Sequence, residues 1–255
     1  MELIFSTLMF ALAVQVLVFI PAYLFKTDKL TDLAYGLGFI AAAIYAYSHG
    51  FQNVLGVILM FMIIMWGVRI SMFLFMRILV MGRDSRFDGL RERFWKFLLF
   101  WIMQGITIWI LLTPAIVLFG ARELDYGRWI FFVIGFIVWL AGFMIETAAD
   151  YQKSRFKTLN PKRTAFVNTG LWKYSRHPNY FGEILCWSGV FLFAVPAMSG
   201  ISYLSIVGPV WITFLLLFVT GIPVLEKQYA KRYKNSSEYQ EYRRTTSILV
   251  PLPKK

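Results

Sequence analysis

The chain is predicted to be an all-α integral membrane protein, a polytopic bundle of about seven transmembrane helices. Hydrophobic residues make up 58% of the 255 residues and charged residues only 16%, which is more apolar than an ordinary soluble domain. The apolar residues gather into stretches, most of which reach the roughly 20 residues that a helix needs to cross about 30 Å of hydrocarbon. No fixed-period repeat or low-complexity linker separates them, so residues 1–255 are predicted to form a single transmembrane domain.

The predicted spans follow one another along the whole chain. They cover residues 4–25, 32–47, 54–80, 97–119, 129–149, 182–196 and 202–225. The second and sixth stretches are short, which leaves a tilted or re-entrant segment, and a count one lower or one higher, open. The first stretch begins at Met1 with no basic segment and no small-residue cleavage site, so we expect a retained helix and not a signal peptide.

The net charge of +12 is distributed as a membrane protein requires, and not as a nucleic-acid-binding surface. Seven spans place 22 of the 26 Lys and Arg on one face, in the segments 26–31, 81–96, 150–181 and 226–255. By the positive-inside rule this face is cytoplasmic, which puts the N-terminus outside and the C-terminus inside. We expect a bacterial inner (cytoplasmic) membrane location, membrane lipids as partners, and no nucleic-acid partner.

The segment 226–255 is predicted to be a cytoplasmic tail that docks on the membrane domain. Its charged first half suggests an amphipathic helix, and the apolar residues 248–252 suggest a docked, strand-like end. Its scattered basic residues are attributed to membrane orientation and anionic headgroups rather than to a ligand. The lone Cys186 suits packing, and two histidines far from it in sequence argue against a structural zinc site.

A first group of candidate site residues lies at the end of the fifth predicted span. Glu146, Asp150 and Lys153 are spaced i, i+4 and i+7, so they share one face of a helix. Carboxylates there can accept hydrogen bonds from ribose hydroxyls, and Lys153 with Lys157 can meet phosphates. An interfacial ion-pair ladder is the alternative, and it explains the deep Glu146 least well.

A second group lies in the polar, aromatic and basic run 170–183. Pro178 predicts a helix start, and Asn179 and Glu183 are spaced i, i+4 behind it. The amides of such a helix start favour a phosphate group. The other candidates in the run are Trp172, Tyr174, Arg176, His177 and Tyr180. A turn role for His177, and interfacial anchoring by Trp172 and Tyr174, are the alternatives.

A third group runs from the third predicted span into the connection that follows it. It consists of Arg69, Arg77, Arg83, Asp84 and Arg86. Arg77, Arg83 and Arg86 can snorkel to the interface, whereas Arg69 lies deeper and should face the protein interior. Its expected acidic neighbour is Asp32, close to Tyr35 at the start of the second span, so a purely structural Asp32–Arg69 pair stays an alternative.

Together these residues resemble the bacterial branch of the steroid 5-alpha-reductase-like membrane enzymes. The resemblance rests on Gly170-Leu171-Trp172, Ser175-Arg176-His177-Pro178-Asn179-Tyr180 and Gly182-Glu183, with Glu146, Asp150 and Lys153 before them. It implies an integral membrane oxidoreductase that holds NADPH on the cytosolic side and reduces a carbon–carbon double bond conjugated to a ketone in a lipid substrate. By resemblance, Asp150, Asn179 and Glu183 fall on cofactor-binding positions. Together with the candidates from the residue pattern, the predicted cofactor-binding residues are Arg77, Arg83, Arg86, Glu146, Asp150, Lys153, Lys157, Trp172, Tyr174, Arg176, His177, Asn179, Tyr180 and Glu183.

At the substrate end the chain departs from the family pattern. The steroid reductases use a Gln-Glu pair and a Tyr to grip the substrate carbonyl; here Asp32 falls at the acidic position and Trp66 at the tyrosine. Gln52-Asn53 is a competing match for the pair, ranked lower because it lies on the side opposite the basic face. The catalytic candidates are therefore Asp32, Tyr35, Trp66 and Arg69, and the implied substrate is a steroid-like or other lipid that enters from the bilayer. Asp32 can donate a proton only when it is protonated; otherwise Tyr35 or a water becomes the donor.

A second resemblance implies a different enzyme class. Arg176-His177-Pro178 with Tyr180 and Gly182, a later Glu and a Tyr-rich tail also look like the isoprenylcysteine carboxyl methyltransferases, which bind S-adenosylmethionine. Adenosylmethionine carries no phosphate, so the extended basic segments would have little use there. A non-enzymatic protein whose basic face recruits lipid or a partner ranks last, because it gives the predicted intramembrane charges no purpose.

Overall fold

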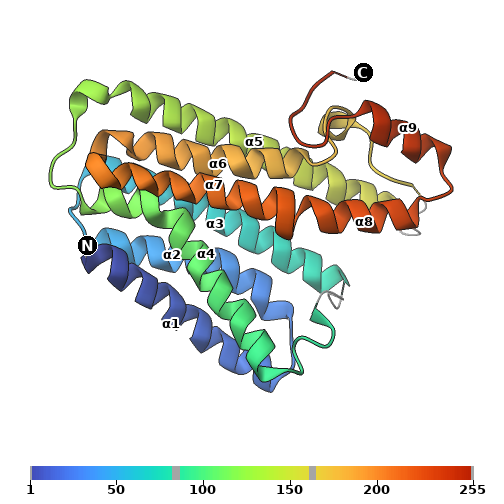
Figure 1. Cartoon of the computed structure of the whole chain (residues 1–255), viewed down its shortest axis with the longest axis horizontal. Helices are drawn as coiled ribbons and strands as arrows, with labels where there is room; N and C mark the ends of the chain where they lie inside the picture. The colour runs from blue at the N-terminus through green and yellow to red at the C-terminus, as the bar shows by residue number, and fades with distance from the viewer. Residues whose placement is uncertain (1, 82–86, 161–164, 254–255) are drawn as a thin grey trace. The chain divides into compact units, whose positions relative to one another are not determined.

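The computed structural model describes residues 2–81, 87–160 and 165–253, and within them it is built of helices with no β-strand (Figure 1). Among these described residues, seven helical segments are long and apolar enough to cross a membrane, which confirms the predicted all-α class and the count of spans. The first six are α1 (Glu2–Leu24), α2 (Lys29–Ser48), α3 (Val54–Met81), α4 (Phe94–Gly120), α5 (Ile130–Leu159) and α6 (Pro178–Ala194).

The seventh span is a broken helix that extends from Gly200 to Arg232. It consists of a 3₁₀ segment η5 (Gly200–Ile206), helix α7 (Val207–Phe214), a π-helical turn η6 (Leu215–Val219) and helix α8 (Ile222–Arg232). Gly221 lies at the break, where a Cβ atom would come within 2.6 Å of the Leu216 carbonyl oxygen. A further helix, α9 (Ser237–Thr245), follows in the tail.

Two boundaries differ from the prediction. Helix α5 continues through Asp150 to Leu159, and α8 carries the last span through Glu226 to Arg232. Both extensions contain charged residues. Charged residues mark the end of an apolar stretch, but they do not interrupt the backbone hydrogen bonds of a helix. The predicted start of a helix at the Pro178-Asn179 step is confirmed.

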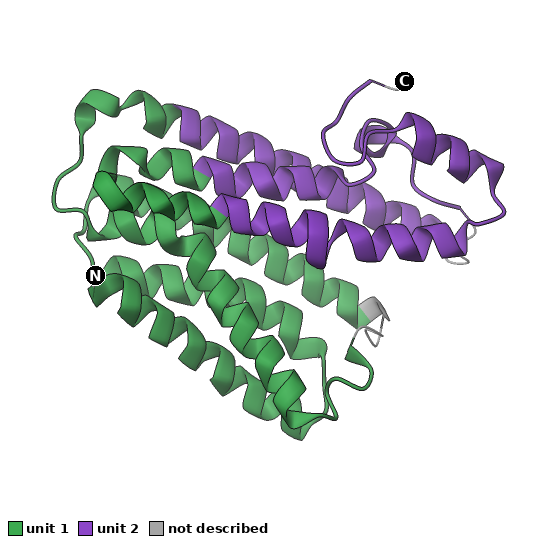
Figure 2. Ribbon diagram, in the orientation of Figure 1, with its two compact units in different colours: residues 1–133, 190–208 green, residues 134–189, 209–255 purple. Residues whose placement is uncertain are grey.

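The chain divides into two compact units (Figure 2). Unit 1 consists of residues 1–133 and 190–208, and unit 2 of residues 134–189 and 209–255. The boundaries fall within α5, within α6 and just after the start of α7, so three spans contribute to both units.

A chain of buried amides crosses the core of unit 1. Gln104 Nε2 donates to Gln15 Oε1 and to the Thr31 carbonyl oxygen, each at 3.1 Å, and Gln15 Nε2 donates to the Ala34 carbonyl oxygen at 3.1 Å. Polar groups at membrane depth must be satisfied within the protein, and these contacts join α1, α2 and α4. Aromatic packing of Phe19 against Phe97 and Trp101 fills the space beside them.

Glycines hold α5 and α6 in close contact within unit 2. A Cβ atom at Gly182 would lie 2.6 Å from the Glu146 amide nitrogen and 2.7 Å from the Gly142 carbonyl oxygen, and one at Gly189 would lie 2.5 Å from the Trp139 amide. Small residues at such crossings let the helix backbones touch, which is how helices associate where lipid replaces water. The acidic residues of α5 are thereby held beside the first turns of α6.

Candidate functional site

The polar run before α6 is fixed against α5 by side-chain contacts. Leu171 N donates to Gln152 Oε1 at 2.9 Å, and the buried Trp172 donates from Nε1 to the Ala149 carbonyl oxygen at 3.0 Å. The backbone reaches this position through Gly170, whose φ of +60° favours glycine. The ammonium group of Lys153 lies 4.6 Å from the centre of the Trp172 ring, a cation–π contact.

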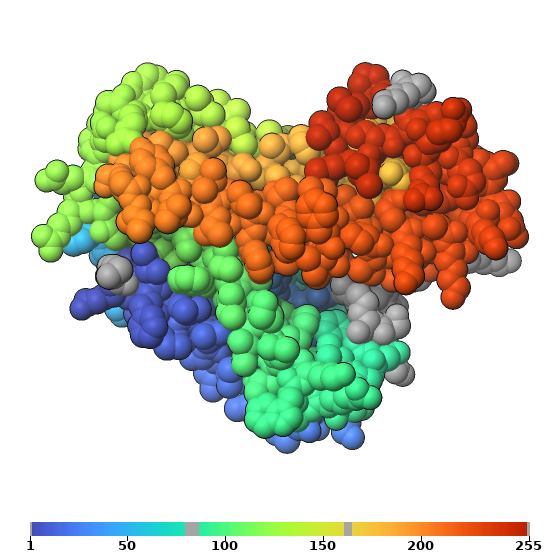
Figure 3. Space-filling model, viewed as in Figure 1, coloured from blue at the N-terminus to red at the C-terminus, as the bar shows by residue number. Residues whose placement is uncertain are grey.

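The C-terminal tail closes over the same run. Ser175 and Ser247 form a parallel bridge, Arg176 N donates to the Ser247 carbonyl oxygen at 2.8 Å, and Leu252 N donates to the Tyr174 carbonyl oxygen at 3.1 Å. Figure 3 shows the tail, in red, packed against the yellow residues of this segment. Segments that are about 70 residues apart in sequence therefore meet here.

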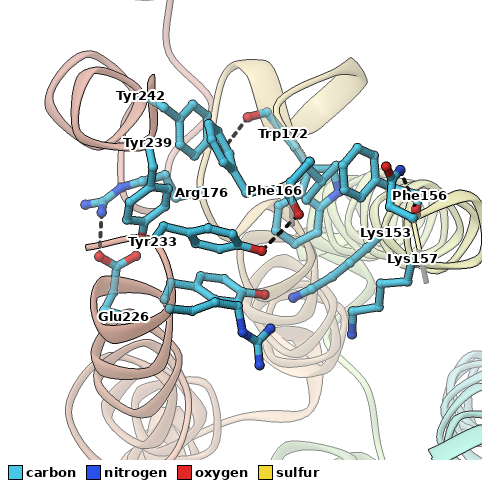
Figure 4. Close-up of a pocket in the computed structure, with 15 residues that line it drawn as sticks. Lys153, Phe156, Lys157, Phe166, Trp172, Arg176, Glu226, Tyr233, Tyr239 and Tyr242 are labelled. Atoms are coloured by element: carbon cyan, nitrogen blue, oxygen red, sulfur yellow. Dashed lines mark hydrogen bonds and ion pairs between the residues drawn. The ribbon is translucent and has the colours of Figure 1, made fainter. Parts of the chain in front are cut away.

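Between these two segments lies an open pocket of about 600 Å³, a volume that includes solvent at its mouth (Figure 4). All of its lining residues belong to unit 2. They are Lys153, Phe156, Lys157, Asn160, Ala165, Phe166, Val167, Trp172, Arg176, Glu226, Tyr229, Arg232, Tyr233, Tyr239 and Tyr242. Four of them are cationic, one is acidic and seven are aromatic, so the pocket suits a ligand that combines negative charge with a flat ring.

Two phenols of the pocket donate hydrogen bonds to backbone carbonyl groups. Tyr233 OH donates to the Ala165 carbonyl oxygen at 2.9 Å and Tyr242 OH to the Trp172 carbonyl oxygen at 2.7 Å. Burial raises the pKa of Tyr239 to about 12 and also raises the pKa of Tyr242. Tyr239 OH is buried and finds no hydrogen-bond partner among the described residues.

One carboxylate organises the wall of the pocket. Glu226 Oε2 lies 2.5 Å from Arg176 Nη1 and 3.4 Å from Arg243 Nε, and Glu226 Oε1 lies 3.1 Å from His177 Nε2. The His177 side chain is fully buried and stacks on Tyr180 at 5.5 Å between ring centres. Burial lowers the pKa of His177, and the hydrogen bond to Glu226 opposes this only in part, so the imidazole is neutral near pH 7.

The predicted cofactor-binding residues divide into four sets by position. Lys153, Lys157, Trp172 and Arg176 line the pocket. Glu146, Asp150, Tyr174, His177, Asn179, Tyr180 and Glu183 lie in unit 2 without lining it. Arg77 belongs to unit 1, and Arg83 and Arg86, like Asp84, fall outside the described residues.

Within the second set, the acidic and amide groups are well placed for a polar ligand. Glu146 and Asp150 are 2% and 4% exposed, so each is an acidic group held inside unit 2. Asn179 Oδ1 is buried and finds no partner among the described residues.

Two residues of the set bear on the alternative roles. Tyr174 is 42% exposed, and the ammonium of Lys173 lies 5.6 Å from its ring centre, which fits the interfacial alternative. His177 bonds to the Glu226 side chain and not to backbone through its ring, so the simple turn role does not describe it.

The four catalytic candidates all lie in unit 1. Trp66 is 1% exposed and forms an aromatic cluster with Phe39 and Tyr35, at 5.1 Å and 6.5 Å between ring centres. The basic partner that Asp32 contacts is Arg77, with 2.8 Å between Nη2 and Oδ2, whereas Arg69 was the expected neighbour. Arg77 lies two helical turns beyond Arg69 on α3 and reaches back with its long side chain.

Several pocket residues were missed by the sequence-based prediction. They are Phe156, Asn160, Phe166, Glu226, Tyr229, Arg232, Tyr233, Tyr239 and Tyr242. A signal was present: Tyr229 and Tyr233 are spaced i, i+4 and Tyr239 and Tyr242 i, i+3, so each pair shares a helix face. Arg232 was grouped with the scattered basic residues of the tail, and the structure places it in the wall of the pocket.

Fold and site together define an integral membrane protein of helices whose second unit carries a basic, aromatic-lined pocket. The sequence matches the family described as "Protein of unknown function (DUF1295)" over residues 18–246, and the chain belongs to that family. No solved structure matches it significantly.

Three curated relatives are each less than 30% identical to the chain over about half of its length. An uncharacterised protein of Schizosaccharomyces pombe is 24% identical over 159 residues, which cover 55% of this chain and 45% of that protein. The 3-oxo-5-alpha-steroid 4-dehydrogenase 1 of Macaca fascicularis is 28% identical over 120 residues, 47% of this chain and 40% of the enzyme. The human enzyme of the same name is 27% identical over 120 residues, 47% of this chain and 41% of the enzyme. Less than half of each relative is thus covered.

Proposed function

We propose that the chain is an NADPH-dependent membrane reductase that acts on a carbon–carbon double bond conjugated to a ketone in a steroid-like or other lipid substrate. The single observation that carries the proposal is the pocket of unit 2, with four cationic and seven aromatic residues in its wall. Similarity to two 3-oxo-5-alpha-steroid 4-dehydrogenases supports the same reaction class. The bacterial branch of that family and an inner-membrane location, with the pocket in the cytosol, remain predictions from the residue pattern and the charge asymmetry.

The residues of unit 2 fit a phosphorylated dinucleotide. Lys153, Lys157, Arg176 and Arg232 provide charge for phosphate groups, and the faces of the pocket tyrosines provide stacking surface for a base. The buried Asn179 Oδ1 provides an acceptor for an amide N–H group. We assign phosphates and base to the pocket, and hydrogen bonding to ribose or amide groups to Asp150, Asn179 and Glu183.

When bound, the nicotinamide would supply a hydride for the β-carbon of the substrate enone. The protein must then stabilise negative charge on the ketone oxygen and provide a proton. Asp32 Oδ2 accepts a hydrogen bond from Arg77 Nη2 at 2.8 Å, so this oxygen is already engaged within the protein. We therefore assign the proton donor to Tyr35, the substrate-binding surface to Trp66, and charge stabilisation to Arg69.

An S-adenosylmethionine-dependent methyltransferase is the second candidate. Glu226 bonds to Arg176 and His177, so three features of the methyltransferase resemblance lie in one cluster. Aromatic faces also suit a sulfonium cation. The four cationic side chains of the pocket, however, repel a cation and attract phosphates, and this favours the dinucleotide.

Ligand titrations separate the two candidates. The protein is purified in mild detergent, and its thermal stability is followed while NADPH and S-adenosylmethionine are added separately. A ligand that binds only the folded state stabilises it by about 2.7 kcal/mol at a hundredfold excess over Kd. We expect stabilisation by NADPH alone. Stabilisation by S-adenosylmethionine alone would reverse the assignment, and turnover of an enone with NADPH consumption would establish the reaction.

A further inference from the structure

Glu226 is the one acidic residue among the residues that line the pocket, and it contacts three basic groups from two other segments. Arg176 and His177 immediately precede α6, and Arg243 lies in α9. The Glu226 side chain is only 12% exposed, so water competes weakly for it. A carboxylate placed in this way fixes the positions of its partners because both of its oxygens are used.

The contact with His177 also fixes the imidazole. The ring is neutral, so Nε2 carries the proton that it donates to Glu226 Oε1, and Nδ1 is left as an acceptor. The buried ring stacks almost parallel on Tyr180, with an interplanar angle of 5°. Tyr180 follows Asn179 in the first turn of α6, so Glu226 restrains both the pocket wall at Arg176 and the start of the helix that carries Asn179.

We propose that Glu226 is a positioning residue: it holds Arg176 and His177 in the geometry that binds the cofactor. This inference rests on the proposed function. Glu226 acts through these neighbours, since its two oxygens already face them. Without the carboxylate, Arg176 is free to adopt other rotamers and the start of α6 loses a restraint. Support of this kind is worth about tenfold to a hundredfold in ligand affinity at comparable sites.

The test compares the affinities of single and double variants for NADPH. Calorimetry in detergent is carried out on the full chain, on Glu226→Gln, on Arg176→Gln and on the double variant. We expect Glu226→Gln to weaken binding about tenfold or more, and the double variant to bind no more weakly than the weaker single variant, because both changes remove the same arrangement. Glu226→Asp keeps the charge but shortens the reach, so it should restore part of the affinity.

A matched control is available on α9. Glu241 pairs with Arg244 at 3.0 Å on the surface, where its side chain is 58% exposed, so Glu241→Gln removes an acidic ion-pair partner without touching the pocket. Its NADPH affinity should equal that of the unmodified protein. The thermal stability of each ligand-free variant is measured in parallel. If Glu226→Gln does not fold, Glu226→Asp and Arg176→Gln form the same comparison.

The outcomes are distinct. Additive losses in Glu226→Gln and Arg176→Gln, or unchanged affinity in Glu226→Gln while the unmodified protein binds NADPH, would overturn the positioning role and leave the proposed function intact. Absence of NADPH binding by the unmodified, folded protein would overturn both. A lower thermal stability with unchanged affinity would show that Glu226 serves the fold alone, which also contradicts the proposal.

Discussion

The two units use their buried polar groups in different ways. In unit 1, Gln15 and Gln104 bond to each other and to backbone carbonyls, and Asp32 pairs with Arg77. In unit 2, four buried atoms able to accept hydrogen bonds find no partner among the described residues: Asn179 Oδ1, His177 Nδ1, Tyr239 OH and Thr246 Oγ1. Buried acceptors are normally satisfied, so an unused one points to a ligand or a water. We infer that the amide chain of Gln15 and Gln104 in unit 1 joins helices, whereas the unused acceptors of unit 2 are available to the proposed ligand.

The largest effect should follow from breaking the close contact between α5 and α6 in unit 2. A Cβ atom at Gly182 would lie 2.6 Å from the Glu146 amide, so Gly182→Val must force α5 and α6 apart. We expect destabilisation near the upper end of about 1–3 kcal/mol, and loss of the NADPH response. Thermal unfolding with and without NADPH measures both. Gly120→Ala is the control, because its Cβ would meet Leu3 only at 3.5 Å; equal tolerance at both positions would contradict the close contact.

Removing the unused acceptor should affect binding and spare the fold. Asn179→Ala deletes the buried Oδ1, and we expect NADPH affinity to fall about a hundredfold, or about 2.7 kcal/mol. Both Asn179→Ala and Glu183→Ala should abolish the thermal response at an NADPH concentration near the Kd of the unmodified protein. Lys231→Ala, at an exposed position outside the pocket, should leave it unchanged. Equal losses in all three variants would show that the assigned residues are not specific.

A substitution in the amide chain of unit 1 should lower the stability of the fold and leave NADPH binding unchanged. Gln104→Leu leaves Gln15 Oε1 and the Thr31 carbonyl oxygen without their donor, which costs about 1–3 kcal/mol of stability. We expect a lower unfolding temperature and an unchanged Kd for NADPH, measured on the folded protein by calorimetry. A large change in Kd would remove the proposed division between the two units.

A smaller effect is expected at the charged wall of the pocket. Lys153→Met removes one cation from the pocket and its contact with Trp172 while keeping an unbranched side chain of similar length. We expect NADPH affinity to fall about tenfold, or about 1.4 kcal/mol, and the loss to shrink as salt is added because screening weakens charge–phosphate attraction. Calorimetry at two salt concentrations measures both. A loss that salt does not change would indicate a packing role for Lys153.

The smallest effect concerns pH. Burial lowers the pKa of His177 in the folded protein, so below about pH 6.5 the unfolded imidazole binds a proton that the folded one does not. Stability should therefore fall as the pH drops below that value, by at most about 1.4 kcal/mol per pH unit. Unfolding temperatures at pH 7 and pH 5 test this. The pH dependence should weaken in His177→Asn and persist in His49→Asn, because His49 is exposed.

Much of the fold could be predicted because membrane-spanning helices are recognised from long runs of hydrophobic residues. The order of seven apolar stretches and the helix start at Pro178 follow from hydrophobicity and from proline geometry. Helix was expected at Glu146, Asp150 and Lys153 and in the first half of segment 226–255, but the ends of α5 at Leu159 and of α8 at Arg232 could not be predicted, because charged residues end an apolar stretch without ending a helix. For the same reason Glu226, the first charged residue after the last predicted span, was assigned to the cytoplasmic tail and was not considered a site residue.

The site was predicted in part, for a reason that the pocket makes clear. Trp172 and Arg176 lie in the polar run 170–183, and Lys153 shares a helix face with Glu146 and Asp150, so local polarity and spacing indicated all three. Tyr229, Arg232 and Tyr239 come from a segment more than 50 residues later, and no local spacing shows that this segment folds back. Asp32 pairs with Arg77, whereas Arg69 was expected. The difference depends on how far the long arginine side chain extends along the helix, which residue spacing alone does not fix.

The late position of these pocket residues in the chain affects how the protein is made. All seven apolar helices precede Tyr239 and Tyr242, and the bridge to Ser175 needs Ser247. During translation, the helices can therefore enter the bilayer before the pocket has its last wall. The proposed dinucleotide therefore cannot guide that insertion; it would bind only a bundle that has already assembled, so its contribution to yield should come through slower degradation of the finished protein.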